Sequence, residues 1–109
     1  MKVGIDWGGT KIEGIVLEPS TGKELLRKRV DSPKDNYVEI INKVCELIND
    51  ISVNFDDFSV GIGMPGSLHP ETGLVQVSNT KALEGQNVKN DLEKKLGYEV
   101  KIANDADCL

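Results

Sequence analysis

The stretch VGIDWGGTKI, residues 3–12, decides the fold of this 109-residue chain. Its two flanks, Lys2–Asp6 and Ile12–Leu17, are apolar and rich in β-branched residues, which predicts adjacent strands joined by a tight turn. Beside and within the turn stand an acid, two glycines, a hydroxyl and a cation, at Asp6, Gly8, Gly9, Thr10 and Lys11. The acid and the cation need an explanation beyond the turn itself.

Two explanations of this turn are open. In the first, the glycines serve only the backbone geometry of a hairpin. In the second, the glycine N–H groups approach a phosphate, Thr10 adds a hydroxyl donor and Lys11 adds positive charge. Asp6 fits the second explanation if it holds Mg²⁺, which bridges phosphate oxygens. The pattern GxxxxGK[ST] is absent and a strand follows the glycines, so the turn is not a P-loop. The acid, hydroxyl and cation together favour phosphate.

The rest of the chain alternates strand and helix patterns. Apolar runs predict strands over Glu24–Val30, Val60–Met64, Leu74–Val77 and Val100–Ala103. Apolar residues at helical spacing predict one helix that Asn36 caps and a second over 87–96 that Asn87 caps and Gly97 ends. The order β-β-β-α-β-β-α-β predicts an α/β fold with a mixed β-sheet and helices on its faces.

Composition excludes several classes of protein. The net charge of -5 argues against a nucleic-acid partner and gives no support to membrane binding. The basic run over residues 27–29 is typical of a solvent-exposed edge strand. The cysteines, Cys45 and Cys108, form no metal-binding or CxxC pattern. We therefore expect a cytoplasmic protein with free thiols.

The last residues, IANDADCL, predict a strand followed by a helix start at Asn104-Asp105. A helix of about one turn is not stable alone. We therefore expect the chain to be one piece of a longer protein. These two residues have two explanations, a helix cap or polar groups at the crevice where the strands of an α/β sheet end.

The pattern Asp6-x-Gly8-Gly9-Thr10-Lys11 resembles the first phosphate motif of the sugar-kinase, heat-shock-protein and actin superfamily. Within it, the chain resembles the ROK family of bacterial sugar kinases and sugar-responsive repressors, especially its fructokinase, mannokinase and N-acetylhexosamine kinase branches. Three more stretches carry the resemblance: GIGMPGSLHPETG at 61–73, SNTKALEGQ at 78–86 and ANDADCL at 103–109. It implies an actin-like, ribonuclease H-like ATPase lobe over residues 1–109, the N-terminal lobe of a kinase whose C-terminal lobe is absent here.

The resemblance also implies roles for individual residues. ATP phosphates would be held by Asp6, Gly8, Gly9, Thr10 and Lys11, with Asp6 on Mg²⁺ directly or through water. The sugar would be held by Gly66, Asn79, Asn104 and Asp105, with Asp105 as catalytic base. Each residue also has a plainer explanation: Gly66 as a turn residue, Asn79 as a loop residue, and Asn104 or Asp105 as a helix cap. We expect His69 to be a solvated loop residue and Trp7 to pack beside the hairpin.

The activity that the resemblance implies is transfer of the ATP γ-phosphate to a hexose, at the 6-hydroxyl, as in a glucokinase. Ala82 stands in a region where close relatives carry tryptophan, so the choice of hexose stays open. The complete protein is expected to be a homodimer, a structural zinc ion would lie outside this chain, and the isolated chain is expected to be inactive. Two alternatives are open. One is a sugar-sensing repressor, but repressors of this family carry an N-terminal helix-turn-helix, and we expect none here because the first predicted strand begins at Lys2. The other is a non-catalytic lobe that docks a partner chain.

Overall fold

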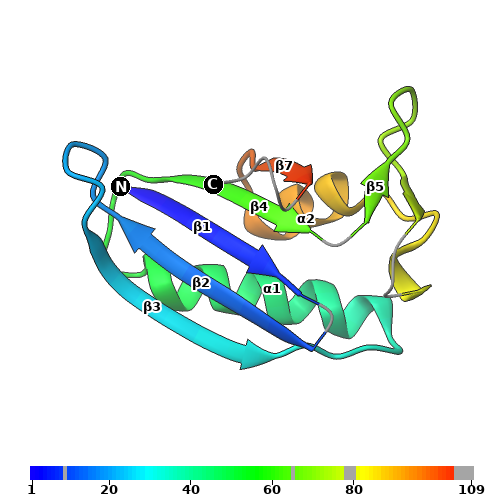
Figure 1. The fold of residues 1–109 in the computed structure, drawn as a ribbon, viewed down its shortest axis with the longest axis horizontal. Helices are drawn as coiled ribbons and strands as arrows, with labels where there is room; N and C mark the ends of the chain where they lie inside the picture. Colours follow the sequence, from blue (N-terminus) through cyan, green and yellow to red (C-terminus); the bar gives the residue numbers. More distant parts are fainter. Residues whose placement is uncertain (9, 65, 78–80, 105–109) are drawn as a thin grey trace.

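The computed structural model describes residues 1–8, 10–64, 66–77 and 81–104. The strands within these ranges are β1 (Lys2–Trp7), β2 (Lys11–Leu17), β3 (Glu24–Asp31), β4 (Ser59–Met64), β5 (Ser67–Leu68), β6 (Val75–Val77) and β7 (Lys101–Asn104). The α-helices are α1 (Tyr37–Ser52) and α2 (Val88–Leu96), and a 3₁₀ turn over Lys81–Leu83 precedes α2 (Figure 1).

The main sheet has the strand order β3-β2-β1-β4-β7. β1, β2 and β3 form an antiparallel meander, whereas β4 and β7 run parallel to β1. This confirms the predicted mixed sheet. Because β1, β4 and β7 run parallel, their carboxyl ends meet at one edge, where α/β sheets place their ligands.

Local sequence signals set the ends of both helices. The side chain of Asn36 accepts a hydrogen bond from the N–H of Glu39 at 3.1 Å and begins α1. Asn87 accepts the equivalent bond from the N–H of Asn90 at 3.1 Å and begins α2. Gly97 ends α2 with φ of +86°, in the left-handed region that favours glycine. All three capping predictions are confirmed.

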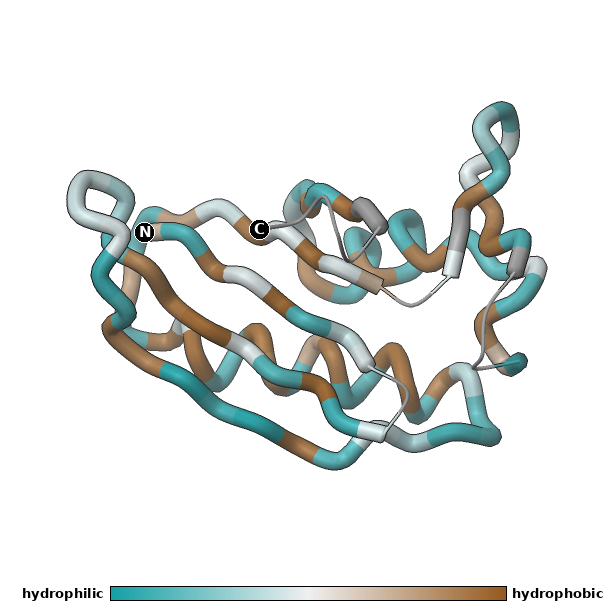
Figure 2. Tube along the Cα trace, viewed as in Figure 1, coloured by the Kyte–Doolittle hydropathy of each residue, from teal (hydrophilic) through white to brown (hydrophobic). Residues whose placement is uncertain are grey.

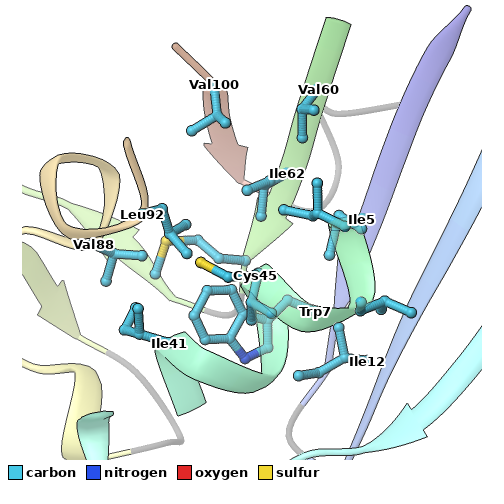
Figure 3. Packing of buried hydrophobic residues seen from close by; sticks show 14 of the residues in the cluster. Ile5, Trp7, Ile12, Ile41, Cys45, Val60, Ile62, Val88, Leu92 and Val100 are labelled. Carbon is cyan, nitrogen blue, oxygen red and sulfur yellow. The ribbon is translucent and has the colours of Figure 1, made fainter. Parts of the chain in front are cut away.

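The two faces of the sheet differ because strand side chains alternate. Val3, Ile5 and Trp7 of β1 are buried, and α1 contacts β1, β2 and β3 on their side of the sheet. The two helices share one core with the strands, and Figure 3 shows Leu92 of α2 beside α1 and Trp7. Within the described ranges, both helices therefore cover one face. The opposite face, with the side chains of Lys2 and Asp6, is called the open face below.

The edge strand β3 is the most solvated strand of the main sheet. All its residues except Val30 are exposed, and the hydropathy colouring turns hydrophilic along much of its length (Figure 2). Its run Arg27-Lys28-Arg29 places charge on an edge, which discourages pairing with another sheet. This confirms the predicted charged edge strand.

One predicted strand belongs to a different sheet. The segment predicted as Leu74–Val77 forms β6, which pairs antiparallel with β5 in a separate two-stranded sheet. The sequence does not reveal β5, because two residues are too few to show a period of two. The β5–β6 hairpin projects from the carboxyl edge of the main sheet (Figure 1).

Candidate functional site

The β1–β2 hairpin is closed by its own backbone. Trp7 pairs with Ile12, and the N–H of Gly8 donates a hydrogen bond to the carbonyl of Lys11 at 2.9 Å. A Cβ at position 8 would lie 3.1 Å from that carbonyl, which explains a glycine there. The N–H of Gly8 is thus used within the hairpin, so a phosphate in this conformation would draw its donors from other groups. Gly9 lies outside the described residues.

Trp7 anchors the hairpin in the core. Its side chain is fully buried and packs beside Ile41 and Cys45 of α1 (Figure 3). The indole Nε1 has no hydrogen-bond partner in the part of the chain that the structure describes. An unpaired buried donor costs about 1–3 kcal/mol, which the burial of so large a ring offsets. The prediction that Trp7 packs beside the hairpin is confirmed.

The polar residues of the hairpin are accessible. Asp6, Thr10 and Lys11 are all exposed, and Asp6 lies on the open face. The carbonyl of Thr10 accepts a hydrogen bond from the N–H of Ser32 at 3.0 Å, which ties the hairpin to the segment after β3. The hairpin therefore presents a carboxylate, a hydroxyl and an ammonium group to solvent.

Lys11 has a partner that the sequence did not reveal. Its ammonium forms an ion pair with Asp31, the residue opposite it on β3. The ammonium lowers the pKa of the Asp31 carboxyl through a hydrogen bond and its charge. Both side chains are more than half exposed, so the pair is weak and solvent-screened. A bound phosphate and Asp31 would compete for this ammonium group.

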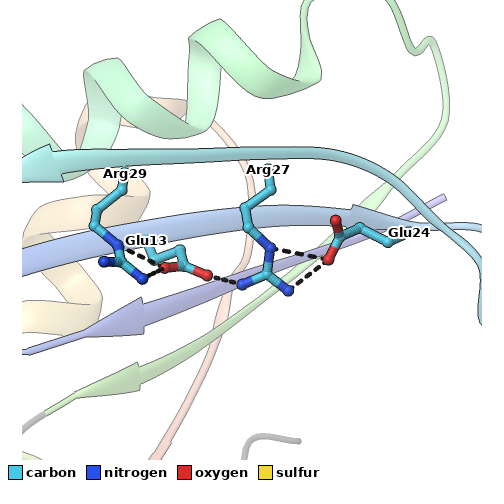
Figure 4. Close-up of polar contacts among 4 residues, drawn as sticks. All are labelled: Glu13, Glu24, Arg27 and Arg29. Carbon is cyan, nitrogen blue, oxygen red and sulfur yellow. Dashed lines mark hydrogen bonds and ion pairs between the residues drawn. The ribbon is translucent and has the colours of Figure 1, made fainter.

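Glu13 is a further charged group beside the hairpin. It lies opposite Asp6 and is only 14% exposed at its side chain. Arg27 and Arg29 of β3 both form ion pairs with it, and Arg27 also binds Glu24 (Figure 4). The position of Glu13 opposite Asp6 can be deduced from the sequence, because the hairpin turn is short. Its arginine partners cannot be deduced in this way, because they depend on the pairing of β2 with β3.

The carboxyl edge of the parallel strands gathers the other predicted residues. The register sets Asp6 beside Gly63, and Met64 beside Asn104 at the end of β7. Gly66 follows β4 with φ of +104°, a conformation that requires glycine. The backbone thus brings Asp6, Gly66 and Asn104 to one edge of the sheet. Asn79 and Asp105 lie outside the described residues.

The turn between β5 and β6 holds His69. The backbone N–H of His69 donates to Leu74 at 2.8 Å, and its Nδ1 accepts a hydrogen bond from the N–H of Glu71 at 3.2 Å. These contacts are local to the turn, and the residue is partly exposed. They agree with the prediction of a loop residue.

A cavity of about 630 Å³ lies on the open face at the opposite end of the strands. Gly4, Ile15, Leu17 and Gly61 line it, together with residues before β7. None of the predicted site residues that the structure describes lines this cavity, which lies away from the carboxyl edge.

The donor set at the edge suits a metal ion that arrives with a nucleotide. Among the described residues, no group of three or more His, Cys, Asp or Glu side chains is placed to hold a metal ion. Mg²⁺ typically binds one or two carboxylates together with substrate phosphates. Asp6 supplies one exposed carboxylate beside the hairpin, which fits that mode.

Comparison with known proteins identifies the family. Residues 2–109 match the ROK family. The chain therefore belongs to the ROK family. Within the described ranges, no helix has the length and apolar character needed to cross a membrane.

Curated relatives are named as sugar kinases. The chain is 38% identical over 109 residues to N-acetyl-D-glucosamine kinase of Pasteurella multocida (strain Pm70). It is 39% identical over 110 residues to the enzyme of that name from Escherichia coli O139:H28 (strain E24377A / ETEC). Each match covers 99% of this chain but 36% of the relative.

Solved structures agree with the fold. A ROK family glucokinase from Streptomyces griseus, in complex with glucose and AMPPNP, matches with a TM-score of 0.85 and 27% identity. The match covers 97% of this chain and 33% of that one. A ROK hexokinase from Thermus thermophilus matches with a TM-score of 0.81 and 26% identity over 96% of this chain and 35% of that one. The predicted actin-like ATPase fold is confirmed.

Proposed function

We propose that the complete polypeptide that contains this chain transfers the γ-phosphate of ATP to a hexose hydroxyl, and that residues 1–109 are its N-terminal lobe. One observation carries this proposal. Three separate motifs of a ROK chain reach the same edge of the sheet through Asp6, Gly66 and Asn104. The family membership and the names of the relatives support a kinase activity.

The hairpin side of the site holds the nucleotide. Thr10 and Lys11 donate to phosphate oxygens, and Gly8 and Gly9 keep the turn narrow enough for phosphates to approach. The carboxylate of Asp6 would hold Mg²⁺, directly or through water, and the bound ion would supply positive charge against the phosphates. The exposure of Asp6, Thr10 and Lys11 supports this assignment.

The strand-end side of the site holds the sugar. Gly66, Asn79 and Asn104 contact sugar hydroxyls, and Asp105 directly follows β7, which ends at the edge. The carboxylate of Asp105 takes the proton of the attacking hydroxyl while the oxygen bonds to the γ-phosphorus and ADP leaves. The transition state of such a transfer is loose, so positioning and charge neutralisation do most of the work.

The acceptor is proposed to be a hexose or an N-acetylhexosamine, phosphorylated at the 6-hydroxyl. The names of the Pasteurella multocida relative and of the Streptomyces griseus glucokinase complex support this class of sugar. The complete protein is proposed to be a cytoplasmic homodimer with a C-terminal lobe that closes the site.

A second candidate is a sugar sensor without phosphoryl transfer. A ROK family transcriptional regulator shares the fold with a TM-score of 0.76 at 18% identity. A sensor would bind sugar but not Mg·ATP, so titration of the complete polypeptide with each ligand separates the two candidates.

The test of the base is Asp105→Asn in the complete polypeptide. We expect turnover to fall by roughly 10²- to 10⁴-fold with a smaller change in the KM for sugar, because the hydroxyl loses its proton acceptor. Asp107→Asn removes the same charge two residues further on and serves as the matched control. Turnover near that of the unmodified protein in Asp105→Asn would contradict the assignment.

A further inference from the structure

A row of side chains crosses the open face at the base of the hairpin. Arg29 of β3 lies opposite Glu13 of β2, Glu13 lies opposite Asp6 of β1, and Asp6 lies beside Gly63 of β4. Neighbouring strands are about 4.8 Å apart, so the two carboxylates of this row are close neighbours. The row thus sets Glu13 beside the carboxylate that we assign to Mg²⁺.

Glu13 is held by two guanidinium groups. Arg29 donates to Oε2 of Glu13 from Nε at 2.8 Å and from Nη2 at 2.6 Å, and Arg27 pairs with Oε1 (Figure 4). Glu13 is also the most buried member of the cluster, at 14% side-chain exposure against 64% for Arg29. Both oxygens of Glu13 are therefore neutralised on the side away from Asp6.

Without these partners, Glu13 would disturb the site that its neighbour serves. Like charges directly opposite each other on antiparallel strands repel. A bare carboxylate here would also repel a triphosphate, and it would offer a divalent ion a second ligand away from the nucleotide. Glycine at position 63 adds no side chain on the other flank of Asp6, so Glu13 is the charged neighbour in this row.

We propose that Arg29, supported by Arg27, is a positioning residue of the phosphate site: it neutralises Glu13 so that Asp6 alone meets the nucleotide-bound cation. The inference rests on the proposed function. Arg29 acts through Glu13 and does not contact the nucleotide.

The chain offers a matched control on the same strand. Lys28 adjoins Arg29 but points to the helix side of the sheet, where it pairs with Asp50 of α1 at 2.9 Å. Lys28→Gln and Arg29→Gln each remove one positive charge and one ion pair from β3. They differ in the face of the sheet that loses the charge.

The experiment is calorimetric titration of the complete polypeptide that contains this chain with Mg·AMPPNP, with circular dichroism to verify folding. We expect Arg29→Gln to weaken binding by roughly three- to tenfold and Lys28→Gln to leave it nearly unchanged. Adding Glu13→Gln to Arg29→Gln should restore binding, because the carboxylate that repels the phosphates is gone. Glu13→Gln alone should bind at least as tightly as the unmodified chain, and it supplies the test if Arg29→Gln does not fold.

Three results overturn the inference. Equal binding by Arg29→Gln and Lys28→Gln would show that the Arg29 charge is not felt at the site. Failure of Glu13→Gln to rescue Arg29→Gln, or weaker binding by Glu13→Gln alone, would show that Arg29 does not act through Glu13. Absence of Mg·AMPPNP binding by the unmodified complete polypeptide would instead contradict the assignment of the phosphate hairpin, on which the inference rests.

Discussion

Lys11 and Asp31 lie directly opposite each other on β2 and β3, and their side chains form an ion pair at the mouth of the hairpin. The ammonium that would bind phosphate is thus shared with a neighbouring carboxylate. Because both side chains are exposed, the pair is easily exchanged for a stronger partner. The affinity of the Lys11 ammonium for phosphate therefore depends on Asp31, which lies outside the hairpin motif.

Asp31→Asn is expected to strengthen phosphate binding, because the ammonium of Lys11 no longer has a competing carboxylate. Titration of the complete polypeptide with Mg·AMPPNP should show a dissociation constant lower by roughly two- to fivefold. Asp50→Asn is the control, since it removes the same charge from the partner of Lys28 on the helix side. Equal effects of the two variants would mean that only net charge matters.

Thr10→Val combined with Lys11→Ala is expected to weaken Mg·AMPPNP binding by roughly tenfold or more, because a hydroxyl donor and a charged donor are lost. In the complete polypeptide, the dissociation constant for sugar should change much less. Lys23→Ala removes a charge from the turn at the far end of β2 and should leave nucleotide binding unchanged. Unaltered nucleotide affinity in the double variant would refute the phosphate assignment of the hairpin.

Gly14→Ala is expected to lower the free energy of unfolding by about 1–3 kcal/mol, as measured by urea denaturation. Its Cβ would lie 2.6 Å from Cδ1 of Ile51 and 3.3 Å from Cγ of Leu47, both side-chain atoms of α1, so these side chains would have to repack. Gly61→Ala in β4 is the control, because its Cβ would meet nothing within 4 Å. That variant should stay within about 1 kcal/mol of the unmodified chain. Equal destabilisation by both would show that close packing under α1 is not the cause.

The two tyrosines are expected to ionise above the ordinary tyrosine range. Burial, and then the hydrogen bond from the Tyr37 hydroxyl to Asp91 at 2.5 Å, raise the pKa of Tyr37 well above 10.0. Burial also raises the pKa of Tyr98. The unfolded chain releases these protons first, so the contribution of the two tyrosines to stability is constant below about pH 10 and is lost as the pH rises beyond it. Absorbance at alkaline pH, recorded with unfolding curves, measures both effects.

Asp91→Asn tests the cause of the Tyr37 shift. It removes the carboxylate that opposes phenolate formation, so the pKa of Tyr37 should move back toward 10.0. Asp35→Asn removes an equal, exposed charge before α1 and should leave the tyrosine titration unchanged. A titration unaffected by Asp91→Asn would leave burial as the sole cause.

The sequence predicted the elements that depend on neighbours along the chain. The caps Asn36 and Asn87 and the terminator Gly97 act within one helical turn, and their signals are readable without knowledge of the fold. The β1–β2 hairpin is equally local, since one short turn joins its strands. The fold class could be predicted from these local features.

What the sequence could not predict depends on pairing between distant segments. The partners of Glu13 and Lys11 lie on β3, and the β2–β3 register has an irregularity at Val16 and Leu17 that no local pattern reveals. The use of the Gly8 N–H within the hairpin likewise depends on how the turn closes. The charges of the motif were therefore recognised, but their partners were not.

Asp6 and Trp7 are consecutive, so the pleat of β1 sends the carboxylate to solvent and the indole to the core. One residue inserted between Val3 and Asp6 would invert that division, burying an acid and exposing the largest ring in the chain. The spacing of the motif is thus enforced by the hydrophobic core as well as by any ligand. Residues in this part of β1 can therefore be substituted more easily than residues can be inserted. The packing of Trp7 in the core fixes which face of the sheet carries Asp6.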